Sequence, residues 1–291
     1  MVASHPVLGL IGGSGLYDVE MLEAPEEVRV ATPFGAPSDA IIRGKMKGTD
    51  TTVLFLPRHG RGHRIPPSAI NYRANICALK LLGATHVLSV SAVGSMRESI
   101  APGDLVVVDQ FIDLTKRRVS TFFGERVAAH VSFADPVCPI LANAVYEAAK
   151  TTDATVHKGG TYVCIEGPQF STRAESRVYR GWGVEVIGMT NMPEAKLARE
   201  AELPYATLAL STDYDCWHET EQAVHVEAVI ATLQRNVVHA KEVARALCRM
   251  LPDVSQSPAT GALKGAIMTA PSAIPDDVRT DLDWLIGRYL R

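Results

Sequence analysis

Short apolar runs alternate with longer stretches of helical periodicity through residues 7–215. The runs are four to seven residues long, lack period-2 alternation and are rich in Val, Ile and Leu, which is typical of strands buried on both faces. The predicted strands are Val7–Ile11, Val53–Leu56, His86–Ala92, Asp104–Asp109, Thr161–Ile165, Val184–Ile187 and Tyr205–Leu210. The predicted helices between them are Pro67–Leu82, Pro139–Lys150, Arg173–Trp182 and Pro193–Glu202. This order predicts an α/β fold, a single domain with a mixed, largely parallel central sheet flanked by helices.

The end of the chain follows a different pattern. Residues 223–250 predict a long amphipathic helix that closes a domain over residues 1–251. Residues 252–274 begin with a stretch rich in Ser, Pro and Gly and predict a linker-like segment. Residues 275–291 repeat apolar side chains at helical spacing, so we expect a short helix that packs on the domain or on a neighbouring subunit.

Composition excludes several classes of partner. The chain has 29 Lys and Arg against 32 Asp and Glu, a net charge of −3, so it lacks the basic excess that binds nucleic acid or anionic lipid. Its five cysteines are scattered, with no C-x-x-C pair, which favours reduced thiols in the cytoplasm over disulfides or structural zinc. We find neither a signal peptide nor a run near the ~18 apolar residues of a membrane span. We therefore expect a cytoplasmic protein with no membrane or nucleic-acid partner.

A glycine-rich loop, Gly12-Gly13-Ser14-Gly15, follows the first predicted strand. Its small residues leave backbone N–H groups accessible, and together with the Ser14 hydroxyl they can bind an anion. The spacing does not match a dinucleotide-binding fingerprint, and no Lys-Ser or Lys-Thr follows as in a P-loop. Alone, such a loop is as often a simple tight turn.

Two further loops rich in hydrogen-bond donors follow predicted strands. One, residues 57–64, contains Arg58, His59 and His63, and the other, residues 89–95, contains Ser91. A solvated basic loop is the alternative interpretation of the first. Because open α/β sheets bind ligands at strand ends, three such loops predict one oxyanion pocket.

Two acids, Asp213 and Asp215, follow the strand predicted over Tyr205–Leu210. If the strand geometry continues, both carboxylates point the same way and can face one ligand. Paired acids tend to raise one pKa, which leaves a carboxyl able to donate a proton to a leaving group. Solvated acids or helix caps are an equally common outcome. The nearby histidines lack metal-ligand spacing, so no metal site is expected.

Residues after two other predicted strands add candidates for a binding pocket. Phe170 can offer a flat face to a planar ring, although a single aromatic is more often core. Ser171 or Thr172 can cap the helix predicted from Arg173. Met189, which is normally a core residue, and the hydroxyl of its neighbour Thr190 lie at a third strand end.

A set of motifs, in order and at matching spacing over residues 7–250, resembles a known family. The motifs include IGGSGL (11–16), RHGR (58–61), NYRANI (71–76), SAVGS (91–95), EGPQFSTRAES (166–176), MT (189–190) and STDYDCW (211–217). With them the chain resembles the 5′-methylthioadenosine phosphorylases, in the trimeric branch of the purine nucleoside phosphorylases. The resemblance implies phosphorolysis of S-methyl-5′-thioadenosine to adenine and 5-methylthioribose 1-phosphate, in methylthioadenosine and purine salvage. It also implies a homotrimer that needs no metal or organic cofactor, with inorganic phosphate as co-substrate.

The resemblance also implies roles for individual residues. The phosphate-binding positions are Ser14, Arg58, His59, Ser91, Ala92 and Thr190. The nucleoside-binding positions are Met189 along the ribose, Phe170 and Ser171 at the purine, Val226 and Val229 at the methylthio group, and His63 and His130 at the pocket edge, His130 coming from a neighbouring subunit. Asp213 and Asp215 match the catalytic pair that recognises N7 and the 6-amino group of adenine. The chemistry fits, because a carboxylate accepts from an amino group and a protonated carboxyl donates to N7.

Two alternatives stay open from the sequence. One is a methylthioinosine or broad purine nucleoside phosphorylase, which release of hypoxanthine rather than adenine would identify. The other is a non-catalytic nucleoside-binding protein on the same scaffold, which would never consume phosphate.

Overall fold

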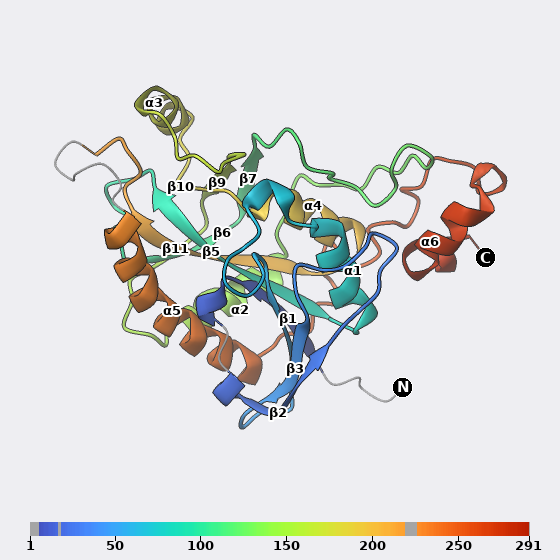
Figure 1. The fold of residues 1–291 in the computed structure, drawn as a ribbon, viewed down its shortest axis with the longest axis horizontal. Coiled ribbons are helices and arrows are strands. Elements are labelled where there is room, and N and C mark those ends of the chain that lie inside the picture. Colours follow the sequence, from blue (N-terminus) through green and yellow to red (C-terminus); the bar gives the residue numbers. More distant parts are fainter. Residues whose placement is uncertain (1–5, 17–18, 219–225, 291) are drawn as a thin grey trace.

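The computed structural model describes residues 6–16, 19–218 and 226–290 (Figure 1). Its centre is a set of parallel strands formed by the apolar runs, β1 (Val7–Gly12), β4 (Thr52–Pro57), β5 (His86–Ser95) and β11 (Tyr205–Asp213). Strand β1 pairs in parallel with both β4 and β5, and β11 pairs in parallel with the other side of β5. Their carboxyl ends therefore meet at one edge of the sheet.

The remaining strands make the sheet mixed, and the described residues form 11 strands in all. They are β2 (Leu22–Val28), β3 (Ile41–Met46), β6 (Leu105–Val108), β7 (Gln110–Asp113), β8 (Val156–Lys158), β9 (Thr161–Cys164) and β10 (Val186–Gly188). Strands β2, β3, β6 and β10 each have an antiparallel partner, whereas β7 and β8 pair in parallel. The predicted fold class is confirmed, although β2, β3, β7 and β8 were not among the predicted strands.

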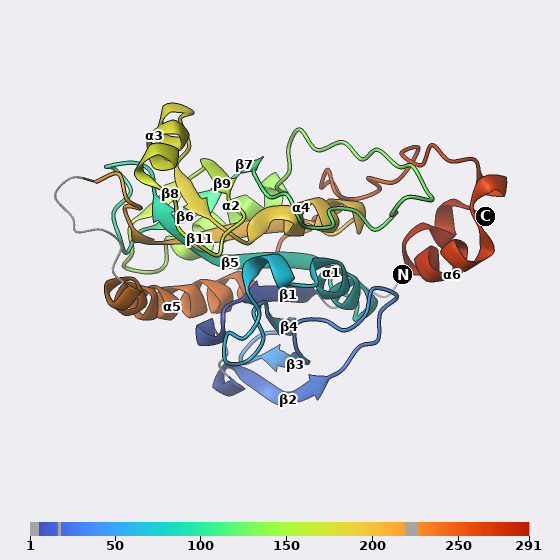
Figure 2. The same cartoon turned by 45° about the horizontal axis from the view of Figure 1, so that its top comes forward.

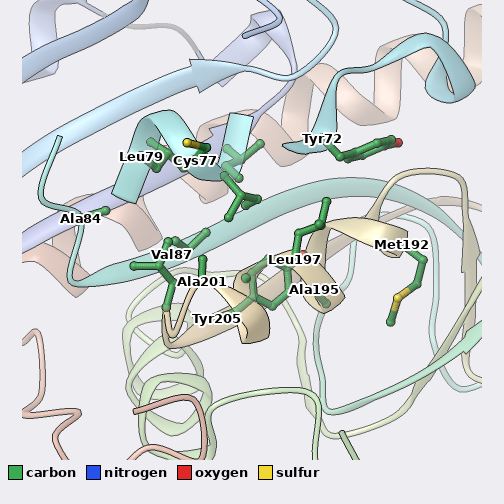
Figure 3. Packing of buried hydrophobic residues seen from close by; sticks show 14 of the residues in the cluster. Tyr72, Cys77, Leu79, Ala84, Val87, Met192, Ala195, Leu197, Ala201 and Tyr205 are labelled. Carbon is green, nitrogen blue, oxygen red and sulfur yellow. The ribbon is translucent and has the colours of Figure 1, made fainter. Parts of the chain in front are cut away.

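Helices cover both faces of the sheet (Figure 2). The α-helices of the described chain are α1 (Tyr72–Leu81), α2 (Pro139–Ala149), α3 (Arg173–Gly181), α4 (Asn191–Glu200), α5 (Val226–Arg249) and α6 (Asp276–Ile286), of which α6 lies to one side of the sheet (Figure 1). Along β4, Leu54 and Leu56 pack toward α1 and α4, whereas Val53 and Phe55 pack toward α2 and α5. Figure 3 shows side chains of α1 and α4 gathered around Val87 of β5. The alternation of the pleat thus explains why these runs are apolar at every position.

A gap beside β5 creates space for a site. On one side of β5, His86–Ser89 pairs with β1 and Gly94–Ser95 pairs with β10. Residues 90–93 pair with neither of these two strands, although β11 continues along the other side. The gap lies at the edge where the parallel strands end.

The C-terminal helix α6 packs on the same chain. Leu282, Leu285 and Ile286 join the core cluster that contains α1 and α4. The Trp284 ring meets the Phe122 ring edge-on, with centroids 5.1 Å apart. Residues 252–274, which join α5 to α6, form turns and one short 3-10 helix, Pro271–Ala273. The division of the chain at residues 251/252 and 274/275 stays a prediction.

A buried acid on α4 predicts a pH dependence of stability. Burial raises the pKa of Glu200 to about 7, although its carboxylate accepts the Phe122 N–H at 2.8 Å. The pKa of Glu200 is higher in the folded chain than in the unfolded chain. Its contribution to stability is therefore complete below the unfolded value near 4.5 and is lost as the pH rises to about 7. Between pH 5 and 8 we expect the wild type to lose about 2–3 kcal/mol more unfolding free energy than Glu200→Gln. Urea unfolding at both pH values measures this, and parallel pH profiles would contradict it.

Candidate active site

A cavity of about 630 Å³ occupies the gap at the carboxyl edge of the sheet. Its walls come from the ends of β4, β5, β10 and β11, from the glycine loop after β1, and from one side of α5. The α5 side is mainly apolar, with Ile230, Leu233 and Val237 facing the cavity. The strand-end loops singled out in the sequence therefore do converge on one pocket.

Most of the predicted site residues line this cavity. They are Arg58, His59, His63, Ser91, Ala92, Phe170, Ser171, Met189, Thr190, Asp213 and Asp215. Ser14 lies between Gly13 and Gly15, which both line it, and Val226 and Val229 lie on α5, but the side chains of these three residues are outside the described part. His130 is exposed, is not among the lining residues, and donates its backbone N–H to Ala266 O at 2.9 Å.

A cluster of hydroxyl groups forms one part of the cavity wall. Ser91 Oγ, on β5, lies 3.1 Å from Thr190 Oγ1 and 3.3 Å from the Tyr162 hydroxyl. Burial raises the pKa of Tyr162 above its usual range, so the phenol keeps its proton. Thr190 precedes α4 and donates its backbone N–H to the same phenol at 3.4 Å. Such a group of rotatable hydroxyls suits an oxyanion with several acceptor oxygens.

Gly188 makes room for this cluster. A Cβ at this position would overlap the hydroxyl of Tyr162, which is fully buried and cannot swing aside. For the phosphate site that the family resemblance implies at Ser91 and Thr190, we expect Gly188→Ala to raise the KM for phosphate about 10–100-fold, because the displaced phenol no longer orders these two hydroxyls. Steady-state kinetics at varied phosphate measures this. Gly181→Ala, where a Cβ meets no atom within 4 Å, is the matched control, and an equal effect of both would contradict the assignment.

Arg58 lies buried at the end of β4 and binds a carboxylate that the sequence did not point to. Its Nε donates to Glu194 Oε2 at 2.8 Å, and its Nη2 donates to Glu194 Oε1 at 3.2 Å and to Ser89 Oγ at 2.5 Å. Burial alone would lower the pKa of Arg58, but Glu194 raises it, so the guanidinium stays charged. The cation that lines the cavity is therefore already paired.

The next residue, His59, is held in one orientation and one tautomer. Its Nδ1 lies 2.8 Å from Ile65 O, and since a carbonyl only accepts, Nδ1 carries the proton. Burial and the neighbouring Arg58 charge lower the pKa of His59 to about 4, so the ring is neutral near pH 7. The His63 ring stacks on it with centroids 4.1 Å apart.

The two acids lie at the end of β11, but one expectation about them was wrong. The strand geometry does not continue past Asp213, because Asp215 adopts a left-handed φ of 52°. The Asp215 backbone N–H instead donates to Asp213 Oδ1 at 2.8 Å, and Thr212 Oγ1 donates to Asp213 Oδ2 at 2.7 Å. This turn still places both residues on the cavity wall. Gly94 lies against them, since a Cβ there would be 3.0 Å from Asp213 Oδ1.

The pKa of Asp215 suits proton donation. Burial raises the pKa of Asp215, and the negative charge of Asp213 adds to the effect. A carboxyl whose pKa is raised in this way can hold a proton near a ligand. Phe170, which is 56% exposed, lines the same cavity, and the neighbouring Ser171 Oγ is buried without a partner in the described residues.

Arg118 supports the site and was missed by sequence reasoning. Its buried guanidinium donates to Met189 O and Met192 O, both at 2.6 Å, and to Glu166 O at 2.8 Å. It thereby ties the two loops that carry Met189 and Phe170. In the sequence it belongs to the run Lys116-Arg117-Arg118, which resembles an ordinary solvated basic stretch, so no local signal could have identified it.

The described residues contain no group of three His, Cys, Asp or Glu side chains arranged to hold a metal. Within the same ranges, no helix has the length and apolar character needed to cross a bilayer.

Comparison with known proteins gives the family of the fold and the site. The sequence model of the phosphorylase superfamily matches residues 7–249, which is most of the chain. The chain belongs to the phosphorylase superfamily. Its α/β fold is similar to that of solved methylthioadenosine phosphorylase structures.

Individual relatives are similar over almost their whole length. An S-methyl-5′-thioadenosine phosphorylase of Geobacter sulfurreducens is 55% identical over 285 residues, covering 98% of this chain and 99% of that protein. A crystal structure of a methylthioadenosine phosphorylase from an Antarctic soil metagenomic library has a TM-score of 0.89 at 49% identity, covering 97% of this chain and 99% of that one. A variant adenosine/methylthioadenosine phosphorylase of Schistosoma mansoni in complex with methylthioadenosine has a TM-score of 0.84 at 36% identity, covering 90% and 99%.

Proposed function

We propose that this protein catalyses the phosphorolysis of S-methyl-5′-thioadenosine to adenine and 5-methylthioribose 1-phosphate. The observation that carries the proposal is the convergence, in one cavity, of an oxyanion-binding cluster and a pair of acids, one with a raised pKa. The high identity to relatives named S-methyl-5′-thioadenosine phosphorylase supports the same reaction. Inorganic phosphate is the co-substrate, and no other cofactor is needed.

In this proposal phosphate binds among Ser14, Arg58, His59, Ser91, Ala92 and Thr190. Ser91 and Thr190 donate hydroxyl hydrogens, and Ala92 donates its backbone N–H. Arg58 binds and orients the anion and does not act as a base. The phosphate stabilises the oxocarbenium-like sugar as the bond to adenine breaks, and one of its oxygens then bonds to the anomeric carbon.

At the other half of the substrate the acid pair receives the leaving purine. One carboxylate of Asp213 and Asp215 accepts from the 6-amino group, and the proton held by the pair passes to N7 as negative charge develops there. Phe170 and Ser171 contact the purine, and Met189 lies along the ribose. His63 and His130 border the pocket, His130 being supplied by a neighbouring subunit.

The apolar side of α5 sets the preference for the 5′ substituent. Ile230, Leu233 and Val237 line the cavity, and Val226 and Val229 extend the same helix toward its start. Burial of one methylthio group contributes only about 1–3 kcal/mol, so discrimination against the 5′-hydroxyl of adenosine is partial. Rates with methylthioadenosine, adenosine and methylthioinosine, measured side by side, test the assignment. Preferred release of hypoxanthine from methylthioinosine would favour a 6-oxopurine enzyme instead.

We further infer that the protein works in the cytoplasm as a homotrimer. Reduced cysteines suit that compartment, and the described structure contains them as free thiols, four of them buried. His130 is exposed, which suits a residue that reaches the pocket of a neighbouring subunit. Light scattering coupled to size-exclusion chromatography measures the assembly, and a monomeric mass at micromolar concentration would contradict it.

A further inference from the structure

Glu194 is the buried partner of Arg58, and it contacts several elements of the site. Both of its oxygens face donors, because Oε1 accepts from Arg58 Nη2 at 3.2 Å and from the Tyr205 hydroxyl at 2.9 Å, and Oε2 accepts from Arg58 Nε at 2.8 Å. The side chains of Glu194 and Arg58 are only 1% and 2% exposed. Water therefore screens neither charge, and each strongly affects the electrostatic potential in the cavity.

The pair leaves Arg58 with little capacity for an anion. Its Nη2 hydrogens are taken by Glu194 and Ser89, and one Nη1 hydrogen is directed to Val90 O at 3.2 Å. In the described part of the chain, the other Nη1 hydrogen has no acceptor, and Arg58 lines the cavity. One N–H is thus available to phosphate, from a guanidinium whose charge is already compensated by a carboxylate.

Glu194 also fixes two walls of the cavity relative to each other. It lies on α4, one turn after Thr190, whose hydroxyl belongs to the cluster around Ser91. Asn191, in the same turn, donates to the Tyr205 hydroxyl at 2.7 Å and to Thr207 Oγ1 at 2.6 Å. Because Arg58 lies at the end of β4, the ion pair joins the α4 wall to the β4 wall.

We propose that Glu194 is a positioning and charge-setting residue of the phosphate site, which neutralises Arg58 and so weakens phosphate binding while it fixes the geometry for turnover. The inference rests on the proposed function. Weak phosphate binding is useful to a phosphorylase, since the product is itself a phosphate ester and has to leave the same site. If Glu194 only held the structure of the site together, its replacement would distort the phosphate site and weaken phosphate binding, which is the opposite result.

The test is the affinity for inorganic phosphate, measured by isothermal titration calorimetry on the full chain. We expect Glu194→Gln to lower the Kd for phosphate about ten-fold or more, because an uncompensated buried cation then faces a dianion. We expect its kcat to fall about ten-fold as Arg58 loses its fixed orientation. The matched control is Glu202→Gln, which removes another buried carboxylate, paired with Arg288 outside the cavity, and keeps the Kd within about two-fold. A Kd for Glu194→Gln that is unchanged or higher overturns the inference.

A double variant keeps the inference testable if Glu194→Gln does not fold. Arg58→Gln/Glu194→Gln removes both charges and leaves no unpaired buried ion. We expect its Kd for phosphate to lie within about ten-fold of the wild type, whereas Arg58→Gln alone weakens binding about 100-fold, because Glu194 then repels the anion. Equal losses in the single and double variants overturn the inference. Absence of phosphate binding by the wild type would instead contradict the proposed function itself.

Discussion

Replacing Asp213 with asparagine is expected to lower kcat/KM for methylthioadenosine about 100–1,000-fold. Asp213 lines the cavity and accepts hydrogen bonds from the Asp215 backbone and from Thr212, so an ordered turn holds it beside the place proposed for the base. The N–H₂ group of the amide opposes the 6-amino group of adenine, and loss of the Asp213 charge removes an interaction that helps Asp215 to hold the proton destined for N7. The same amide can donate to O6, so the preference should shift toward 6-oxopurine nucleosides.

Steady-state rates of Asp213→Asn with methylthioadenosine and methylthioinosine check this expectation. Asp281→Asn, an exposed acid on α6, makes the same chemical change far from the cavity and should keep the wild-type rates with both substrates. Unchanged turnover of methylthioadenosine by Asp213→Asn would refute the role of the acid pair.

Replacing Arg58 with alanine is expected to raise the KM for phosphate about 100-fold or more and the KM for the nucleoside less than about ten-fold. The variant loses a donor to the anion and also leaves Glu194 as an unpaired buried carboxylate, which repels phosphate. Breaking a buried ion pair from one side costs about 3–5 kcal/mol, so the unfolding free energy should fall as well. Kinetics at varied phosphate and urea unfolding measure the two effects.

Arg61→Ala is the matched control for Arg58→Ala. Arg61 lies in the same loop but is half exposed, pairs with Glu27 and Asp39, and does not line the cavity. Exposed pairs contribute about 1 kcal/mol or less, so this variant should change neither KM by more than about two-fold. If Arg58→Ala raised both Michaelis constants equally, the placement of phosphate beside Arg58 would be contradicted.

The central strands could be predicted from the sequence because burial on both faces makes them continuous apolar runs. Strands β2 and β3 could not, since they lie at one end of the sheet and carry charged residues, β2 even containing Pro25. Such a strand forms because it pairs with the neighbouring strand, so its own residues show little of the hydrophobic pattern that predicts a strand.

The same distinction applies to the site. Loops rich in small or donor residues after apolar runs predicted a pocket at the strand ends, and the cavity lies there. The pairing of Arg58 with Glu194 joins residues 136 positions apart, and no local pattern encodes it. The left-handed turn at Asp215 likewise lies against Gly94 on β5, a residue far away in the sequence. The sequence therefore indicated which loops meet at the cavity, whereas the pairing of charges among their residues could be known only from the fold.

Incubation with methylthioadenosine and ¹⁸O-labelled inorganic phosphate tests the central claim most directly. The proposed reaction forms the bond from a phosphate oxygen to the anomeric carbon, so mass spectrometry should find every label in 5-methylthioribose 1-phosphate, with one adenine released per phosphate consumed. Release of adenine at the same rate without phosphate, with water oxygen in free 5-methylthioribose, would contradict it.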